Sequence, residues 1–179
     1  MSEDKHILKI TLEEYKRMKD FQLTYGTAEC KFGKCFVALH EDRICFLKFF
    51  TDATSPKLED LRRTFPGVQL TKNDKLIQEK AKCIFEENNL KILLKGTEFQ
   101  MKVWEELLNI KKGSTCSYED VARAVGNAKA VRAAANAIAN NNVSYLIPCH
   151  RVISKDGSLN KYGGGVERKL QLLKYEHAL

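Results

Sequence analysis

The sequence lacks any apolar run close to the roughly 18 residues that a membrane-spanning helix needs. The first six residues are too polar for a secretory signal peptide. With 44% apolar and 30% charged residues, the composition is that of a globular protein, which excludes disordered and collagen-like chains. We therefore expect a monomer without membrane association inside the cell, in the nucleus of a eukaryote or the cytoplasm of a prokaryote.

The cysteines also lack a metal-binding pattern. None of the six forms a Cys-x-x-Cys pair, and there are only four histidines. An intracellular setting argues against a disulfide framework. A tetrahedral metal site would have to collect scattered ligands such as Cys30, Cys35 and His40. The alternative, which we favour, is that most of these thiols serve as small apolar residues.

Acidic residues are absent between Val121 and Lys155, although the whole chain carries 30 Lys and Arg against 23 Asp and Glu, a net charge of +7. The window contains five basic residues: Arg123, Lys129, Arg132, Arg151 and Lys155. Such a window suits contact with a phosphate backbone, and a solvated basic face is the alternative. The charge pattern favours DNA binding.

The first half of the chain has the pattern of a small mixed α and β domain. Short β-rich runs bounded by glycine or acidic pairs predict an antiparallel meander over residues 23–26, 34–40 and 43–50. Helical patterns follow at 56–64 and 73–87, before a strand-like segment at 90–94.

The second half, from residue 95, is mainly helical by pattern. Apolar residues recur at helical spacing over 98–110, and a last helix is expected at 166–175. Ser117 followed by Asp120 predicts the start of a helix that reaches about residue 125. Asn127 is a candidate cap for a second helix over 128–140. Two short helices around a four-residue turn indicate either a helix-turn-helix or an ordinary helical hairpin.

The second of these helices contains seven alanines, with Arg132 as the main long side chain in its middle. A helix with little side-chain bulk can approach a nucleic-acid groove closely, and an isolated arginine can probe between bases. Tight packing against another helix also uses alanine. The sequence leaves both explanations open.

The most informative stretch is residues 146–153, in which apolar residues flank Cys149, His150 and Arg151. We expect a buried strand or extended segment that presents Cys149. A free thiol has a pKa near 8.5, about the value for cysteine in water, so a nucleophilic cysteine needs a base or positive neighbours. Adjacent strand residues point to opposite sides, so that His150 would act through a bridging water or a turn. Glu176 would orient the imidazole if the last helix folds back.

The run Pro148-Cys149-His150-Arg151 resembles the active-site signature of the O6-alkylguanine-DNA alkyltransferases. The similarity is strong over about 96–176 and looser before it. It extends over several further motifs in the same order: Gly96-Thr97-Glu98-Phe99-Gln100, Trp104, Ser117-Tyr118, Gly126 to Ala133, Asn140-Asn141, Gly157, Tyr162 and Gly164-Gly165.

The resemblance implies an α+β protein of two domains. Residues 1–94 would form a ribonuclease-H-like domain, and residues 95–179 a winged helix-turn-helix domain that carries the cysteine. Such proteins bind duplex DNA by the minor groove, flip out the damaged guanine and move its O6-alkyl group irreversibly to the cysteine. O4-alkylthymine is a second candidate substrate. Each molecule acts once, without a cofactor.

Catalytic roles follow from the resemblance residue by residue. Cys149 would be the nucleophile, His150 would take its proton through a water, and Glu176 would orient His150. Tyr118 would donate a proton toward guanine N3, its alternative being an ordinary surface tyrosine. Asn141 would brace the two halves of the site, its alternative being a helix C-cap.

The resemblance also assigns binding residues. Arg132 would occupy the space left by the flipped base, with a simple phosphate contact as the alternative. Val152 would offer its carbonyl to the guanine amino group. The pocket wall would include Tyr162, Gly163 and Gly164, and a glycine at 163, where some members carry Ser or Trp, hints at room for bulkier alkyl groups. Further DNA contacts are expected from Ser117, Lys129, Ala130 and Arg151.

Some members of the family hold a structural zinc ion in the first domain, but His40 and Cys45 are not obviously equivalent to its ligands. We therefore predict no metal.

Two other classes of function are alternatives to alkyl transfer. A cysteine hydrolase would turn over and would leave the basic helical region unexplained. A DNA-lesion sensor shares the DNA-binding half but lacks the cysteine that this chain has.

Overall fold

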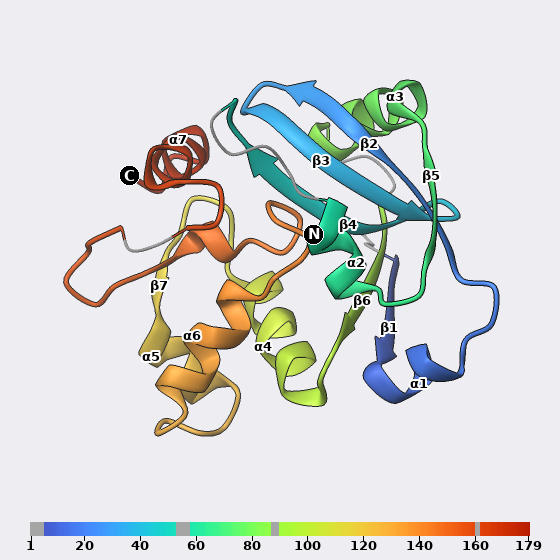
Figure 1. Ribbon diagram of the computed structural model, residues 1–179. Coiled ribbons are helices and arrows are strands. Elements are labelled where there is room, and N and C mark those ends of the chain that lie inside the picture. Colours follow the sequence, from blue (N-terminus) through green and yellow to red (C-terminus); the bar gives the residue numbers. More distant parts are fainter. Residues whose placement is uncertain (1–5, 53–57, 87–89, 160–161) are drawn as a thin grey trace. The chain divides into compact units, whose positions relative to one another are not determined.

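The computed structural model describes residues 6–52, 58–86, 90–159 and 162–179 (Figure 1). The chain divides into two compact units, Met1–Gly96 and Thr97–Leu179. The boundary expected after residue 94 falls inside β6 (Lys91–Gly96), a strand of the first unit. The unit therefore ends with this strand, just before Thr97 caps the next helix.

The first unit contains a six-stranded sheet in the order β1-β6-β4-β3-β2-β5. Its middle is the antiparallel meander that the sequence predicts: β2 (Gln22–Cys30), β3 (Gly33–His40) and β4 (Arg43–Phe50). Three strands pair in parallel with their neighbours: β1 (His6–Thr11), β5 (Gln69–Lys72) and β6. The short strands β1 and β5 were not expected from the sequence.

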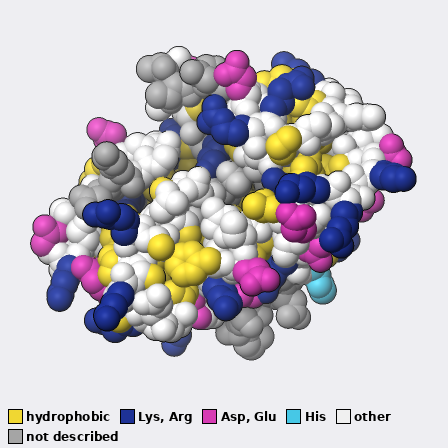
Figure 2. All heavy atoms as spheres, turned by 60° about the horizontal axis from the view of Figure 1, so that its bottom comes forward, with side chains coloured by type: hydrophobic (Ala, Val, Ile, Leu, Met, Phe, Trp, Pro, Cys, Tyr) yellow, Lys and Arg dark blue, Asp and Glu magenta, His cyan; other side chains and the backbone are white. Residues whose placement is uncertain are grey.

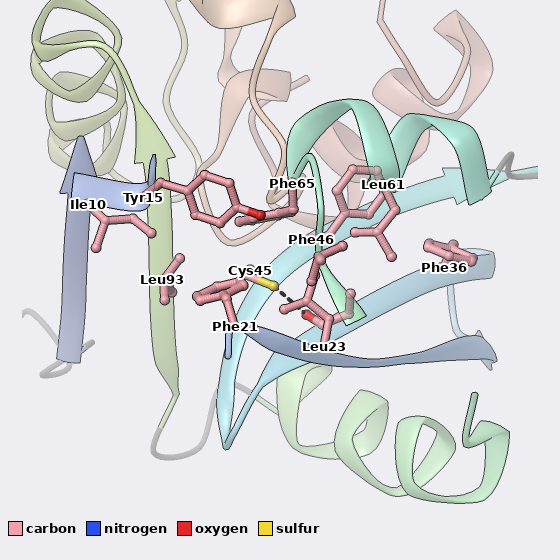
Figure 3. Close-up of a cluster of buried hydrophobic side chains, with 12 residues drawn as sticks. Ile10, Tyr15, Phe21, Leu23, Phe36, Cys45, Phe46, Leu61, Phe65 and Leu93 are labelled. Atoms are coloured by element: carbon pink, nitrogen blue, oxygen red, sulfur yellow. Dashed lines mark hydrogen bonds between the residues drawn. The ribbon is translucent and has the colours of Figure 1, made fainter. Parts of the chain in front are cut away.

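Among the described residues of this unit, three helices accompany the sheet: α1 (Leu12–Arg17), α2 (Leu58–Thr64) and α3 (Asp74–Phe85). The helices expected at 56–64 and 73–87 correspond to α2 and α3, apart from residues 56, 57 and 87, which lie outside the described part. In the core, the rings of Tyr15, Phe21 and Phe65 gather with apolar side chains from the sheet (Figure 3). The Tyr15 and Phe21 ring centroids are 5.2 Å apart in an edge-on arrangement.

Two cysteines of the first unit behave as apolar residues. Cys35 and Cys45 are buried, and the Cys45 thiol donates to the Ala38 carbonyl over 3.4 Å (Figure 3). Burial raises the pKa of Cys45 far above that of a free thiol. The interpretation of these thiols as packing residues is consistent with both observations.

The second unit contains four α-helices among its described residues: α4 (Glu98–Asn109), α5 (Tyr118–Ala124), α6 (Val131–Ala139) and α7 (Val166–Tyr175). The predicted capping box of Ser117 and Asp120 begins α5. The indole of Trp104 donates to the Ala137 carbonyl over 2.9 Å, which ties α4 to α6. A two-stranded parallel ladder joins β7 (Cys116–Ser117) to β8 (Val152–Ile153).

Two local expectations for this unit were wrong. The second helix begins at Val131 rather than at residue 128, because Asn127 does not cap it: its side chain accepts from the backbone N–H of Lys129, two residues on, and forms a turn. The segment that carries Cys149 is not a strand. Cys149–Arg151 forms one turn of 3-10 helix (η1), and extended structure resumes at Val152.

On the face that Figure 2 shows, Lys and Arg side chains are interspersed with Asp and Glu, and apolar side chains are exposed among them. Within the described residues, no helix has the length and apolar character that crossing a membrane requires.

Candidate active site

Cys149 lies buried at the start of η1, where Asn141 fixes the preceding loop. The Asn141 side-chain N–H₂ donates to the Ile147 carbonyl over 2.8 Å and to the Cys149 sulfur over 3.2 Å. Its carbonyl oxygen accepts from the Val143 backbone N–H over 2.9 Å. Asn141 is thus more than a helix cap. An N–H directed at the sulfur also stabilises the anionic thiolate relative to the thiol.

His150, Glu176 and Arg151 form a buried network beside the cysteine. Glu176 follows α7 directly and accepts from His150 Nε2 over 3.0 Å. The Arg151 guanidinium holds both oxygens of the same carboxylate at 2.8 Å and donates to the Ile110 carbonyl over 2.7 Å. His150 is fully buried, and its Nδ1 has no hydrogen-bond partner among the described residues. Nδ1 is therefore the ring nitrogen that remains open to a proton.

The protonation states of this network follow from burial and charge. Burial lowers the pKa of His150, and the hydrogen bond to Glu176 only partly opposes this, so the imidazole is neutral at neutral pH. Burial acts to raise the pKa of Glu176, but the hydrogen bonds from Arg151 and His150 prevail and lower it to about 2. The result is a neutral base oriented by a permanent carboxylate.

Three further polar side chains lie within electrostatic range of Cys149: Tyr118, Tyr162 and Lys169. Burial raises the pKa of both Tyr118 and Tyr162, and in both the nearby Cys149 adds to the effect. These phenols therefore stay protonated and can donate. Lys169 is 1% exposed, and its ammonium donates to the Val152 carbonyl over 2.6 Å. Burial lowers the pKa of Lys169, while Cys149 opposes that shift.

A groove of about 770 Å³ lies on the second unit beside Tyr118 and Arg132. Its other lining residues are Glu119, Val131, Ala135, Ala139, Ser154 and Lys155. Arg132 projects from an exposed position of α6, and small alanines leave the wall beside it low. The wall thus combines a cation, a phenol and little steric bulk.

The remaining predicted residues take different positions. The Ser117 hydroxyl is engaged with Asp120 in the α5 cap, and Arg151 is committed to Glu176, so neither side chain is freely available to DNA. Lys129 is exposed, and Ala130 is the N-cap residue of α6.

In the wall assigned to the substrate pocket, Gly163 is exposed and Gly164 is partly exposed. A Cβ added at Gly163 would meet no atom within 4 Å, so the space there is open.

Sequence reasoning missed two residues of this site. Lys169 lies seven positions before Glu176, on the buried side of an otherwise amphipathic helix, and a lysine in that register was the available signal. Tyr145 stacks on the His150 ring with centroids 6.2 Å apart and adopts a positive φ of 70°. No sequence pattern distinguished Tyr145.

The network predicts a loss of stability in acid. His150 has a folded pKa below that of the unfolded chain, so its contribution is present above about pH 6.5 and is lost as the pH falls below it. Glu176, shifted from 4.5 to about 2, contributes above pH 4.5 and loses up to roughly 3 kcal/mol as the pH falls toward 2.

Urea unfolding followed by the fluorescence of Trp104, the chain's single tryptophan, reports on the second unit. High salt suppresses the contribution of exposed ion pairs. We expect the midpoint to fall from pH 7 to 5 and again below pH 4.5. A constant midpoint across both ranges would contradict the buried network.

Among the described residues, no group of three or more His, Cys, Asp or Glu side chains is arranged to hold a metal ion. The Asn141 N–H directed at the Cys149 sulfur and the neutral imidazole of His150 point to nucleophilic chemistry at the thiol.

Comparisons with known proteins place the chain among 6-O-methylguanine DNA methyltransferases. Residues 98–178 match the family described as 6-O-methylguanine DNA methyltransferase, DNA binding domain. The bifunctional transcriptional activator/DNA repair enzyme Ada of Escherichia coli is 36% identical over 165 residues, covering 88% of this chain and 46% of that protein. A probable methylated-DNA–protein-cysteine methyltransferase of Acanthamoeba polyphaga mimivirus is 50% identical over 88 residues, covering 49% of this chain and 58% of that protein.

The crystal structure of Mycobacterium tuberculosis OGT in complex with DNA is 30% identical, covers 86% of this chain and 92% of that chain, and has a TM-score of 0.67. The chain spans about half the length of the two Ada proteins it matches. A sequence match across the second unit and a structural match across both units lead to one conclusion: the chain belongs to the O6-methylguanine-DNA methyltransferase family.

Proposed function

We propose that this protein repairs DNA by direct reversal, as a methylated-DNA–protein-cysteine methyltransferase. It would move a methyl or larger alkyl group from O6 of guanine in duplex DNA to its own Cys149, with O4-alkylthymine as a second candidate substrate. The observation that carries the proposal is the setting of Cys149, a buried thiol that receives an N–H from Asn141 beside the His150–Glu176 pair. This setting favours a thiolate nucleophile.

The reaction is an in-line displacement. A bond forms between sulfur and the alkyl carbon while the bond from that carbon to O6 breaks. The thiol proton leaves through a water to His150 Nδ1, because Nε2 is engaged with Glu176. Tyr118 donates toward guanine N3 and lessens the charge on the departing base. The thioether product has no route to hydrolysis, so each molecule acts once. The displacement needs only the cysteine sulfur and the alkylated base, so no cofactor takes part.

The substrate pocket would lie beside this network. The Val152 carbonyl would accept from the guanine amino group with its second lone pair, since Lys169 already donates to it. Tyr162, Gly163 and Gly164 would form the wall, and the open space at Gly163 supports room for bulky alkyl groups.

DNA would bind as a duplex on the second unit. We propose that α5 and α6 form a helix-turn-helix, with β7 and β8 in the wing, and that the first unit has a ribonuclease-H-like topology with no part in the chemistry. Lys129, Ala130 and the backbone near Ser117 would follow the DNA strand, and Arg132 would enter the duplex. The protein would act as a monomer wherever DNA is kept, in the nucleus of a eukaryote or the cytoplasm of a prokaryote.

The test is an intact-mass measurement after incubation with an O6-methylguanine duplex. We expect one methyl group per protein, located at Cys149 by digestion, and no further gain with excess DNA. Turnover of substrate without a mass change would indicate a hydrolase. Tight retention on damaged DNA without methylation would indicate a lesion sensor.

A further inference from the structure

The exposed face of α6 carries two asparagines beside Arg132. Asn136 follows Arg132 by four residues and Asn140 follows by four more, and all three are exposed. Four residues on an α-helix correspond to about 6 Å along the axis and about 40° around it. Asn136 therefore lies next to Arg132 on the same side of the helix, and its own side chain is exposed.

The hydrogen bonds around Asn136 fix which end of its amide faces outward. The Asn140 side chain lies 2.8 Å from the Asn136 backbone carbonyl, which can only accept, so Asn140 must turn its N–H₂ toward it. The same N–H₂ lies 3.2 Å from the Asn136 side chain. Two facing N–H₂ groups would repel, so Asn136 presents its oxygen to Asn140 and its own N–H₂ to solvent.

An outward N–H₂ has a defined complement in the minor groove. Both A·T orientations present only acceptors there, adenine N3 and thymine O2. A G·C pair adds the guanine 2-amino group, which is itself a donor and meets a second donor unfavourably. The amide of Asn136 can thus distinguish an A·T pair from a G·C pair by the absence or presence of the guanine 2-amino group.

We infer that Asn136 is a specificity residue that reads the minor groove next to the lesion and favours repair where the neighbouring base pair lacks a guanine 2-amino group. The inference rests on the proposed function, because it assumes that α6 enters the minor groove with Arg132 at the lesion. A preference of roughly two- to twelvefold in rate is expected, which corresponds to the about 0.5–1.5 kcal/mol of one hydrogen bond.

The experiment measures single-turnover methyl transfer from O6-methylguanine duplexes that differ at the pairs one and two steps from the lesion. Each position carries A·T, G·C or inosine·C, since inosine pairs with cytosine but lacks the 2-amino group. We expect A·T and inosine·C to react alike and faster than G·C at one of these positions. Each rate is divided by the rate with free O6-benzylguanine, which reports on the thiol and the fold.

Two variants separate recognition from general binding. Asn136→Ala should make the three contexts equal. Asn136→Asp places acceptors where the N–H₂ was, so the preference should reverse toward G·C even though the added negative charge slows every duplex. Asn109→Ala removes an exposed amide from α4 and should keep the wild-type preference. Equal wild-type rates in all contexts, or a preference unchanged in both Asn136 variants, would overturn the inference. Absence of methyl transfer from every duplex would instead refute the proposed function.

Discussion

Replacing Cys149 by alanine is expected to reduce methyl transfer below detection while damaged-duplex binding stays within a few fold of wild type. The sulfur is the acceptor atom, and no other described side chain in the site is a thiol. The local structure should survive, because Asn141 keeps its bonds to the Ile147 carbonyl and the Val143 N–H when the sulfur is gone. Intact mass with labelled DNA measures the first effect, and a gel-shift titration measures the second.

Cys116→Ala is the matched control for this variant. Cys116 is half-buried in the same unit, and burial together with Asp120 raises its pKa to about 11, which keeps it protonated at neutral pH. Its removal should leave one methyl group per protein. If methylation persists in Cys149→Ala, or disappears in Cys116→Ala, then Cys149 is not the acceptor thiol. Loss of DNA binding in Cys149→Ala would mean that the substitution damaged the fold.

Local patterns predicted the helices of the second unit well because their signals lie within a few residues. The Ser117–Asp120 capping box and the apolar spacing around Trp104 each specify a helix without help from the rest of the chain. The predicted start of α6 was wrong for a related reason. Asn127 is equally suited to capping a helix and to closing a turn, and its contact with Lys129 decides for the turn.

Long-range contacts explain what the sequence could not predict. The strands β1 and β5 are short and owe their place to parallel partners far along the chain. The turn of η1 at Cys149 follows a loop in which Asn141, eight residues earlier, donates to the Ile147 carbonyl. The roles of His150 and Glu176 were first proposed from the residues around Cys149 and then supported by the family resemblance. The 3.0 Å contact between their side chains agrees with the predicted orientation.

The Arg151 assignment shows how a charge pattern can mislead. Its place in the acid-free window from Val121 to Lys155 suggested a contact with DNA, since this window contains no carboxylate to pair with the guanidinium. The fold brings Glu176 from α7 against it, and the guanidinium is 13% exposed. Arg132, in the same window, meets no such partner in the described hydrogen bonds and projects into the groove. The two arginines should therefore respond very differently to substitution.

Arg132→Ala is expected to slow methyl transfer from duplex DNA at least about a hundredfold and to leave the reaction with free O6-benzylguanine near the wild-type rate. Flipping a guanine out of the stack costs a few kcal/mol, and a side chain that fills the vacated space recovers part of that cost. A loss of about 2.7 kcal/mol corresponds to a hundredfold in rate. Single-turnover rates on the two substrates measure the difference.

Arg123→Ala is the matched control, because Arg123 is an exposed arginine of α5 that pairs with Asp120 and carries the same charge. It should change duplex repair by less than about threefold, as expected for an exposed ion pair. The alternative for Arg132, a simple phosphate contact, makes a different prediction. It would lower the salt dependence of binding by about 0.9 log units per log unit of salt and affect binding more than the chemical step.

A duplex with an abasic site opposite the lesion distinguishes the two roles of Arg132 further. The flipped guanine then has no pairing partner to lose, so flipping costs less and the penalty of Arg132→Ala should shrink by about tenfold or more. A phosphate contact would be lost equally on both duplexes, and the penalty would not change. Equal slowing on the paired duplex, the abasic duplex and free O6-benzylguanine would remove Arg132 from base flipping and place its effect in the fold of α6.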